Sequence, residues 1–291
     1  MPSIREVVGR INSVTSTQQI TRAMKMVAAA KLNKVQQQVQ QLRPYADKLS
    51  ATLSHIVAST DQQLAQRYTQ ERPVQKLLLV PITSDRGLCG SFNNHIFKKV
   101  VEYTHQWATA SSIQIDLLVV GKKGLTFFKK RGYKLITDYV ALSSNHLSFK
   151  PASQAAAFIV DAFLSHTYDR VELVYNHFIN TAYQAVKVEQ FLPIASPATK
   201  AMFNTIDYIY EPSQAGLLEQ LIPKALKIQF YKVLLESHAS EHGARMTTMS
   251  KATDNAEELL KSLRITYNRS RQAAITNEIA EIVAGAEALS N

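Results

Sequence analysis

Cysteine, proline and glycine are all scarce in this chain of 291 residues, which has one cysteine, nine prolines and nine glycines. The single cysteine, Cys89, excludes an intrachain disulfide. No apolar run approaches the roughly 18 residues of a membrane-spanning helix, so the sequence predicts no transmembrane segment. The chain also starts directly in a helical pattern without a signal or transit peptide, and we therefore expect a bacterial protein or a mature organellar one.

Proline and glycine are rarest at the two ends of the chain. Only Pro44 and Gly9 interrupt the stretch from Ser3 to Ala58, and only Gly285 interrupts the stretch from Arg245 to Leu289. Because these two residue types are the strongest helix breakers, each end predicts one long helix. At 1.5 Å per residue the N-terminal helix would be ~80 Å long, which is longer than an ordinary domain is wide.

Both ends also carry the narrow apolar seam of a coiled coil. In the N-terminal stretch the seam residues follow one another in alternating steps of four and three: Ala28, Leu32, Val35, Val39, Leu42, Ala46, Leu49, Leu53 and Ile56. The C-terminal stripe is thinner and richer in alanine: Met249, Ala252, Ala256, Leu259, Leu263, Ala273, Ala280 and Ala284. The two ends therefore predict an antiparallel two-stranded coiled coil made by residues 1–60 and 213–288, with a folded-back helical bundle as the alternative.

The middle of the chain has a different period, in which short apolar runs alternate with helical patterns. We expect strands at 76–82, 115–120, 133–140, 170–179 and 185–194, and helices at 92–107, 122–131 and 152–165. Strands that alternate with helices favour a mostly parallel, Rossmann-like α/β domain, here at 74–200. Pro223 lies near the start of the returning helix and predicts a break or kink there.

The chain is basic, with 33 lysines and arginines against 23 acidic residues and a net charge of +10. Up to Ala58 there are eight basic residues and two acidic ones. A positive helix suggests an acidic partner, which is nucleic acid, anionic lipid or the acidic loops of a protein.

Three features of the sequence are candidates for chemistry. The loop SDRGLCG, Ser84 to Gly90, follows a predicted strand but lacks both the Walker A and the GxGxxG spacing, so a structural turn is favoured over a phosphate cradle. His238 and His242 have an i, i+4 spacing, but the residues between them do not form HExxH. Glu278 and Glu281 share a helix face rather than a predicted cleft. We therefore expect no catalytic residue, no metal and no cofactor.

Four stretches of the sequence resemble the gamma subunit of F-type ATP synthases. They are IREVVGRINSVTSTQQITRAMKMVAAAKL at the start, SDRGLCGSFN at 84–93, ASEHGARMTTMSKATDN at 239–255 and YNRSRQAAITNEIAEIVAGA at 267–286. They occur in the order and over the length typical of that family, whereas residues 100–200 carry little family signal. The last stretch fits the family's C-terminal signature at Ile275, Thr276, Glu278, Glu281, Gly285 and Ala286. One departure is Ser91, which stands where the family commonly has a second glycine.

The resemblance implies a rotor subunit, the central stalk of an F-type ATP synthase. The coiled coil would stand inside a ring of three alpha and three beta subunits, and the α/β domain would sit below it with the epsilon subunit on the membrane-embedded c-ring. Proton or sodium flow would turn the c-ring and the stalk, and the chemistry would reside on the beta subunits. The implied location is peripheral, on the cytoplasmic side of a bacterial cell membrane.

The resemblance also implies which residues contact other subunits. Those facing the alpha/beta ring are Met24, Lys25, Ser84, Asp85, Arg86, Gly87, Leu88, Cys89, Gly90, Asn93, Arg271, Gln272, Thr276 and Glu278. Those resting on the c-ring are Tyr208 and Glu211. For each of them the alternative is an ordinary seam or solvated residue.

Two other classes of function compete with the rotor. A basic coiled-coil adaptor that binds nucleic acid would suit the positive N-terminal helix, although its basic residues are not interleaved with aromatics. An enzyme built on the α/β middle would need a phosphate loop or a nucleophile, and the sequence indicates neither.

Overall fold

The computed structural model describes residues 3–59, 67–110, 113–144, 147–181, 183–194 and 214–290. The chain divides into two units, and both long helices contribute to each. One unit contains residues 1–28 and 246–291, and we call it the tip unit. The other contains residues 29–245, and we call it the sheet unit.

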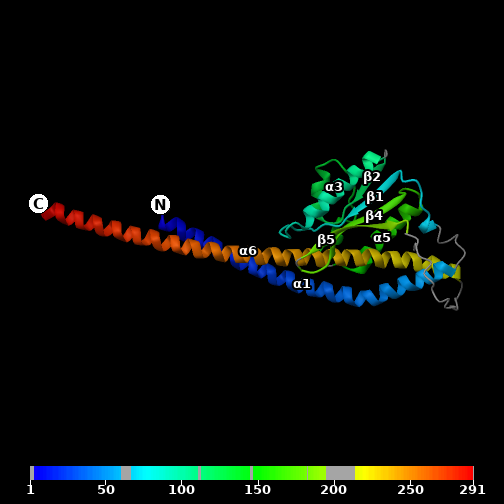
Figure 1. The fold of residues 1–291 in the computed structure, drawn as a ribbon, viewed down its shortest axis with the longest axis horizontal. Coiled ribbons are helices and arrows are strands. Elements are labelled where there is room, and N and C mark those ends of the chain that lie inside the picture. Colours follow the sequence, from blue (N-terminus) through cyan, green and yellow to red (C-terminus); the bar gives the residue numbers. More distant parts are fainter. Residues whose placement is uncertain are drawn as a thin grey trace. The chain divides into compact units, whose positions relative to one another are not determined.

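The sheet unit contains a five-stranded sheet with the strand order β3-β2-β1-β4-β5 (Figure 1). Its strands are β1 (Lys76–Pro81), β2 (Gln114–Leu118), β3 (Lys134–Ile136), β4 (Arg170–Phe178) and β5 (Gln184–Leu192). The first four strands in this order are parallel, and β5 pairs antiparallel with β4. This confirms the predicted mostly parallel α/β fold.

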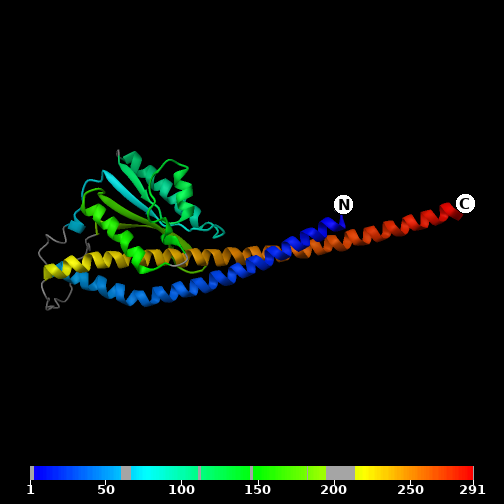
Figure 2. The same ribbon diagram turned by 180° about the vertical axis from the view of Figure 1, so that it is seen from behind.

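Helices cover both faces of the sheet, as Figures 1 and 2 show. They are α3 (Phe92–Ala110) and α4 (Lys122–Lys129) on one face, and α5 (Phe149–Leu164) with part of α6 (Gln214–Ser290) on the other. The central strand β1 shows why both faces need cover: Leu77 and Leu79 pack towards α3, while Leu78 and Val80 pack towards α5. A strand buried on both faces must be continuously apolar, as this one is.

The predicted third strand is shorter than expected. Strand β3 ends at Ile136, and the chain then turns into a short 3-10 helix, η1 (Val140–Ser143), rather than staying extended to Val140. The β3 strand lies at the edge of the sheet and pairs only with β2. An edge strand has hydrogen-bonding partners on one side only, so fewer interactions hold it in extended form.

The two long helices are α1 (Ile4–Ser59) and α6 (Gln214–Ser290), with 56 and 77 residues. In the sheet unit they bury part of the predicted N-terminal seam: Leu32 and Val35 of α1 pack with Leu235 and Ala239 of α6. Val39 and Leu42 are partly buried, and the side chains of Leu53 and Ile56 lie outside the described part. Of the predicted break or kink at Pro223, the break is wrong, because α6 runs through it without interruption, and the kink stays a prediction. Its neighbours Ile222 and Leu226 are both buried in the sheet's core, and this burial offsets the hydrogen bond that a proline removes.

In the tip unit the two helices are antiparallel, since Thr21 contacts Thr253 and Lys25 contacts Ser250. The buried residues there include Val7, Ala28, Met249, Ala256 and Leu260. The predicted seam position at Leu259 is wrong, because this side chain is 49% exposed and its neighbour Leu260 is buried instead. The seam includes a polar residue, Thr253, and an apolar pattern alone therefore loses the register.

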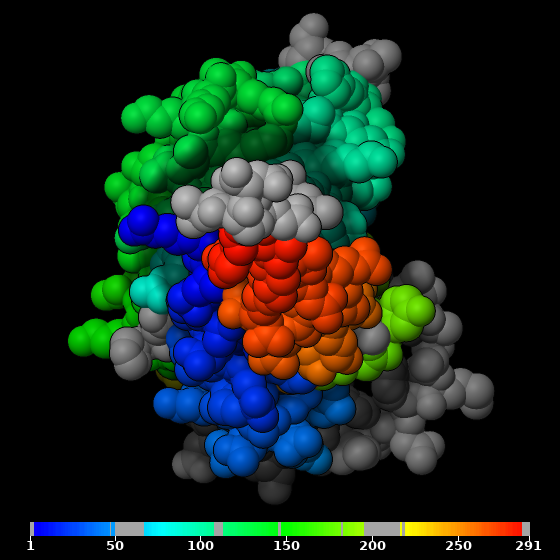
Figure 3. Space-filling view, turned by 90° about the vertical axis from the view of Figure 1, so that its left-hand side faces the viewer, coloured from blue at the N-terminus to red at the C-terminus, as the bar shows by residue number. Residues whose placement is uncertain are grey.

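The last turns of α6 extend past the start of α1 (Figure 1), and Figure 3 shows the two helices side by side, seen from these ends. The predicted seam alanines Ala280 and Ala284 are consequently exposed.

No helix among the described residues is both long and apolar enough to cross a bilayer.

The corrected seam can be tested with two adjacent leucines. We expect Leu260→Ala to lower the free energy of unfolding by about 2 kcal/mol, because it removes a buried side chain and leaves a cavity. Leu259→Ala, the matched control, should change it by less than about 0.5 kcal/mol. Urea unfolding of the full chain, followed by circular dichroism, measures both. Equal losses in the two variants would contradict the register.

Burial of His242 on α6 predicts a pH-dependent stability. Burial, followed by the positive charges of His238, Arg245 and Lys31, lowers its pKa from 6.5 to about 3. The unfolded chain therefore takes up a proton near pH 6.5 while the folded chain does not, so His242 stabilises the fold above that pH. As the pH falls from 6.5 towards 3, we expect this contribution to be lost at up to about 1.4 kcal/mol per pH unit.

His242→Gln should flatten this part of the pH profile, because glutamine does not titrate. The exposed His95→Gln is the control and should leave the slope as it is. Urea unfolding at several pH values between about 7.5 and 5 measures the slopes. A wild-type slope that persists in His242→Gln would show that other groups cause it.

Candidate functional site

The loop Ser84–Gly90 follows β1 and leads into α3. It lies at the carboxyl ends of the parallel strands, next to the bridge that pairs Ile82 with Val120. In parallel sheets this edge is where loops with functional residues gather. The structure therefore places the strongest internal motif of the sequence at the edge where a site is expected.

The inner half of the loop is held by a buried polar network. Ser84 donates its backbone N–H to Oδ1 of Asn93 at 3.0 Å, and Nδ2 of Asn93 donates back to Oγ of Ser84 at 2.8 Å. The Ser84 hydroxyl donates in turn to the carbonyl of Arg86 at 2.7 Å. Cys89 lies against the same group, 3.7 Å from the Ser84 hydroxyl, and burial raises the pKa of its thiol. These side chains fix the turn rather than face a ligand.

A second contact brings the neighbouring loop close to the first. The hydroxyl of Thr83 donates to the carbonyl of Val120 at 2.7 Å and accepts the N–H of Gly124 at 3.0 Å. Gly121 has φ +96°, and a Cβ there would lie 2.1 Å from the carbonyl oxygen of Thr83. Only glycine fits such a close approach.

The outer half of the loop is held by α6. The guanidinium of Arg245 donates to the carbonyls of Arg86 and Gly87 at 3.2 and 3.3 Å. Its other nitrogen pairs with the carboxylate of Glu241, one turn earlier, at 2.6 Å. Both of these charged side chains are largely buried, so the pair is protected from solvent screening. The loop is thereby attached to the long helix at a defined place.

What the loop exposes is an apolar tip beside a positive charge. Leu88 is 65% exposed and has φ +63°, an uncommon conformation for a non-glycine residue. Arg86 is exposed as well. The carbonyls of Arg86 and Gly87 face Arg245, whereas a phosphate cradle needs converging N–H groups. The geometry favours contact with a protein surface over phosphate binding.

The other predicted contact residues lie in the tip unit. Lys25 is exposed, and its ammonium donates to the hydroxyl of Ser250 at 3.0 Å, while Met24 is half-buried. Arg271, Gln272, Thr276 and Glu278 are all exposed on α6, and the Thr276 hydroxyl donates to the backbone carbonyl of Gln272 at 2.9 Å. Tyr208 and Glu211 lie outside the described residues. The described contact residues thus belong to the loop in the sheet unit and to α1 and the end of α6 in the tip unit.

Exposed isoleucines accompany the polar residues at the end of α6. Ile275, Ile279 and Ile282 are 47%, 56% and 70% exposed and follow one another at helical spacing. They therefore form one apolar stripe along the helix. Apolar surface of this kind marks a site of contact with a partner.

Comparison with known proteins identifies the family. The family model described as ATP synthase matches residues 3–289. The ATP synthase gamma chain of Amoebophilus asiaticus (strain 5a2) is 63% identical over 290 residues, covering all of both chains. The chain belongs to the ATP synthase gamma chain family. This confirms the resemblance stated from the sequence, and with it the expected role of a rotor subunit.

Further gamma chains and solved structures agree. The gamma chain of Cytophaga hutchinsonii is 51% identical over 297 residues, again over the whole of both chains. A chain of the Tetrahymena thermophila mitochondrial ATP synthase, from a structure of the central stalk and c-ring, matches with a TM-score of 0.59 and 26% identity. That match covers 80% of this chain and 99% of the other. A chain of the Euglena gracilis mitochondrial ATP synthase matches with a TM-score of 0.66 over 98% and 94% of the two chains, and at 21% identity it shows the fold alone.

Sequence reasoning missed the pair of Glu241 and Arg245. Their i, i+4 spacing on a predicted helix indicates an ion pair, and that signal was available. The sequence carried no signal for the loop that Arg245 contacts, because Arg86 and Gly87 are more than 150 positions away and offer only backbone carbonyls. Which loop a helix residue meets is decided by tertiary packing.

The histidine pair is accounted for without a metal. His238 lies 3.3 Å from the carbonyl of Ser143 through Nε2, and both His238 and His242 are buried. Over the described ranges, no group of three or more histidine, cysteine or acidic side chains could hold a metal ion.

The labelling rate of Cys89 can measure how firmly Arg245 holds the loop, because Cys89 is the only cysteine of the chain and its side chain is 1% exposed. We expect Arg245→Gln to raise the rate of Cys89 labelling by a maleimide about 10-fold, since the loop loses charge-assisted bonds of about 1.5 kcal/mol or more. Lys251→Gln, an exposed change on the same helix, is the control and should leave the rate unchanged. Slow labelling in both variants would mean that Arg245 does not hold the loop in place.

Proposed function

We propose that this chain is the rotating central stalk of an ATP synthase, driven by a c-ring and acting on a surrounding ring of three alpha and three beta subunits. Membership of the gamma chain family over the full length carries the proposal. The chain itself performs no catalysis, and ATP forms on the beta subunits. Proton or sodium flow through the membrane turns the c-ring.

The stalk acts as an asymmetric ligand of the beta subunits, to which it presents different faces as it turns. Each beta subunit passes through open, loose and tight states, and a rotor can drive that cycle only if its contacts differ in free energy between the states. A two-helix rod supplies such contacts while remaining narrow. We assign this rod to residues 1–60 and 213–288 and the α/β foot to residues 74–200.

The exposed groups support two places of contact with the ring. On α6 they are Arg271, Gln272, Thr276 and Glu278, which lie beside the isoleucine stripe Ile275, Ile279 and Ile282. On the sheet unit they belong to the loop from Ser84 to Asn93, whose exposed members include Arg86, Leu88 and Gly90. Met24 and Lys25 add a third group on α1. Acidic loops of the beta subunits would suit the arginines and Lys25.

At the other end of the complex we place the epsilon subunit and the c-ring. Tyr208 and Glu211 are the proposed contacts with the polar loops of the c-ring. The stalk would then be a peripheral part of a bacterial membrane complex, on the cytoplasmic side.

Co-purification separates this function from the adaptor alternative. A tagged rotor should bring alpha and beta subunits in fixed proportion, and these should remain in high salt. A nucleic-acid adaptor would instead bring nucleic acid that is lost as salt rises, because phosphate contacts release counterions. Recovery of nucleic acid without alpha and beta subunits would overturn the proposal.

The contact at Arg271 and Gln272 has its own test. Replacing both with alanine should leave α6 folded, because alanine is the best helix former. It should remove charge-assisted contacts worth about 1.5–3 kcal/mol each once they are desolvated, so ATPase turnover or yield of the assembled complex should fall. Circular dichroism of the isolated chain checks the helix. Unchanged helicity together with unchanged activity and assembly would show that these residues are merely solvated.

A further inference from the structure

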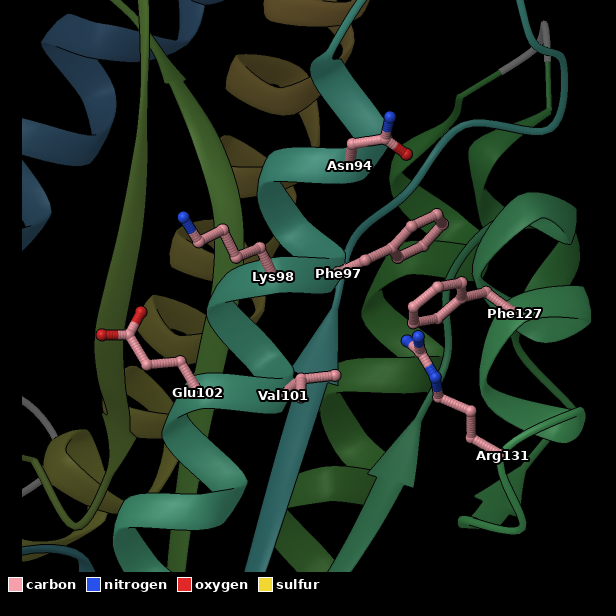
Figure 4. Close-up of a pocket in the computed structure, with 7 residues that line it drawn as sticks. All are labelled: Asn94, Phe97, Lys98, Val101, Glu102, Phe127 and Arg131. Carbon is pink, nitrogen blue, oxygen red and sulfur yellow. The ribbon is translucent and has the colours of Figure 1, made fainter.

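A groove on the outer side of the sheet unit lies between α3 and α4 and has a volume of about 440 Å³. Its lining includes Asn94, Phe97, Lys98 and Val101 of α3, Phe127 of α4 and Arg131 just beyond α4. Figure 4 shows the rings of Phe97 and Phe127 facing each other, with Arg131 beside Phe127 and Lys98 on the far side of α3. None of these residues belongs to the contacts with the ring or the c-ring proposed above.

Arg131 is held in place by the aromatic floor of this groove. The rings of Phe97 and Phe127 stack with centroids 4.0 Å apart and planes 6° apart, and the Arg131 guanidinium lies 3.9 Å from the centroid of Phe127. An arginine that stacks on a ring keeps its N–H donors at the edge of the guanidinium, free for a planar acceptor. The stack therefore presents a carboxylate-binding group that is already oriented.

Helix α4 and the segments on either side of it are rich in positive charge. From Lys122 to Lys134 there are six basic residues and no acidic one. Lys134 is neutralised by the buried Asp116 at 2.8 Å. Among the described residues, no ion pair joins the remaining five, Lys122, Lys123, Lys129, Lys130 and Arg131, to a carboxylate. Of these five, Arg131 lines the groove, and an unpaired cation beside apolar surface favours a negative partner.

We propose that this groove docks an acidic segment of a partner protein. The segment crosses α3, its carboxylates pair with Arg131 and Lys98, and one of its apolar side chains lies against Phe97 and Val101. Glu102 lies at the same rim and pairs with Lys99 at 3.6 Å, so it adds no free negative charge opposite Arg131.

The geometry favours a protein over nucleic acid or a membrane. Phe127 has Arg131 on one face and Phe97 on the other, so neither face of this ring is free for a nucleobase. Stacking on a free aromatic face is the usual basis of single-strand binding. A membrane surface would use the lysines but would gain nothing from a recessed apolar floor.

The test uses the full-length chain and a fluorescein-labelled synthetic peptide of repeating Glu-Leu-Asp-Phe units, followed by fluorescence anisotropy. A second peptide of repeating Glu-Ser-Asp-Ser units has the same charge and no apolar side chains. We expect the first peptide to bind more tightly than the second, and its affinity to fall as salt rises. Arg131→Gln should weaken it by about 2- to 5-fold, in line with the loss of one exposed charge pair.

Matched variants make the result specific. Lys150→Gln removes the same charge from an exposed site on α5 and should have no effect. Val101→Glu places a negative charge in the groove and should weaken the acidic peptide as Arg131→Gln does. Absence of binding, equal binding of the two peptides, or an equal loss in Lys150→Gln would overturn the proposal. So would binding to phosphatidylserine vesicles that is lost in Arg131→Gln while peptide binding is not.

Discussion

The two ends of this chain bury one another's narrow seam, and the rest of the structure depends on that pairing. In the sheet unit the seam joins Leu32 and Val35 to Leu235 and Ala239. In the tip unit its buried residues include Ala28 and Ala256. Small residues let the helix backbones approach closely, and they bury little apolar area for each turn. Such a pairing gains stability by its length rather than by any single contact.

Polar residues interrupt the seam in the tip unit. Thr21 and Thr253 lie 2.9 Å apart through their hydroxyls, and Lys25 bonds Ser250. Polar pairs at seam positions are satisfied in one register only, so they specify alignment at some cost in stability. The same feature misled the apolar pattern at Leu259.

The loop from Ser84 to Gly90 shows how a motif acquires its geometry. Its inner turn is held by Asn93, and its outer carbonyls are held by Arg245 of the long helix. In the sheet unit, therefore, a loop with an exposed apolar tip is attached to the helix that also covers the sheet. Two hydrogen bonds from Arg245 join this loop to α6, and the buried ion pair with Glu241 orients the arginine.

The sequence by itself determined the elements and the family. Scarce proline and glycine predicted the long helices, steps of four and three predicted the seam at Leu32 and Val35, and the apolar run at Leu77 predicted a strand. These signals are local, because each depends on the period of one element. Four stretches of the sequence also sufficed to indicate the gamma chain family.

Only the tertiary structure decided how these elements meet. It set the register that buries Leu260 rather than Leu259, the continuity of α6 through Pro223, and the contact of Arg245 with the loop. It also placed Arg131 on Phe127, which joined a basic run and an aromatic pair into one groove. These features depend either on contacts between residues far apart in the chain or on packing that offsets a local preference. The period of a single segment encodes neither kind of information.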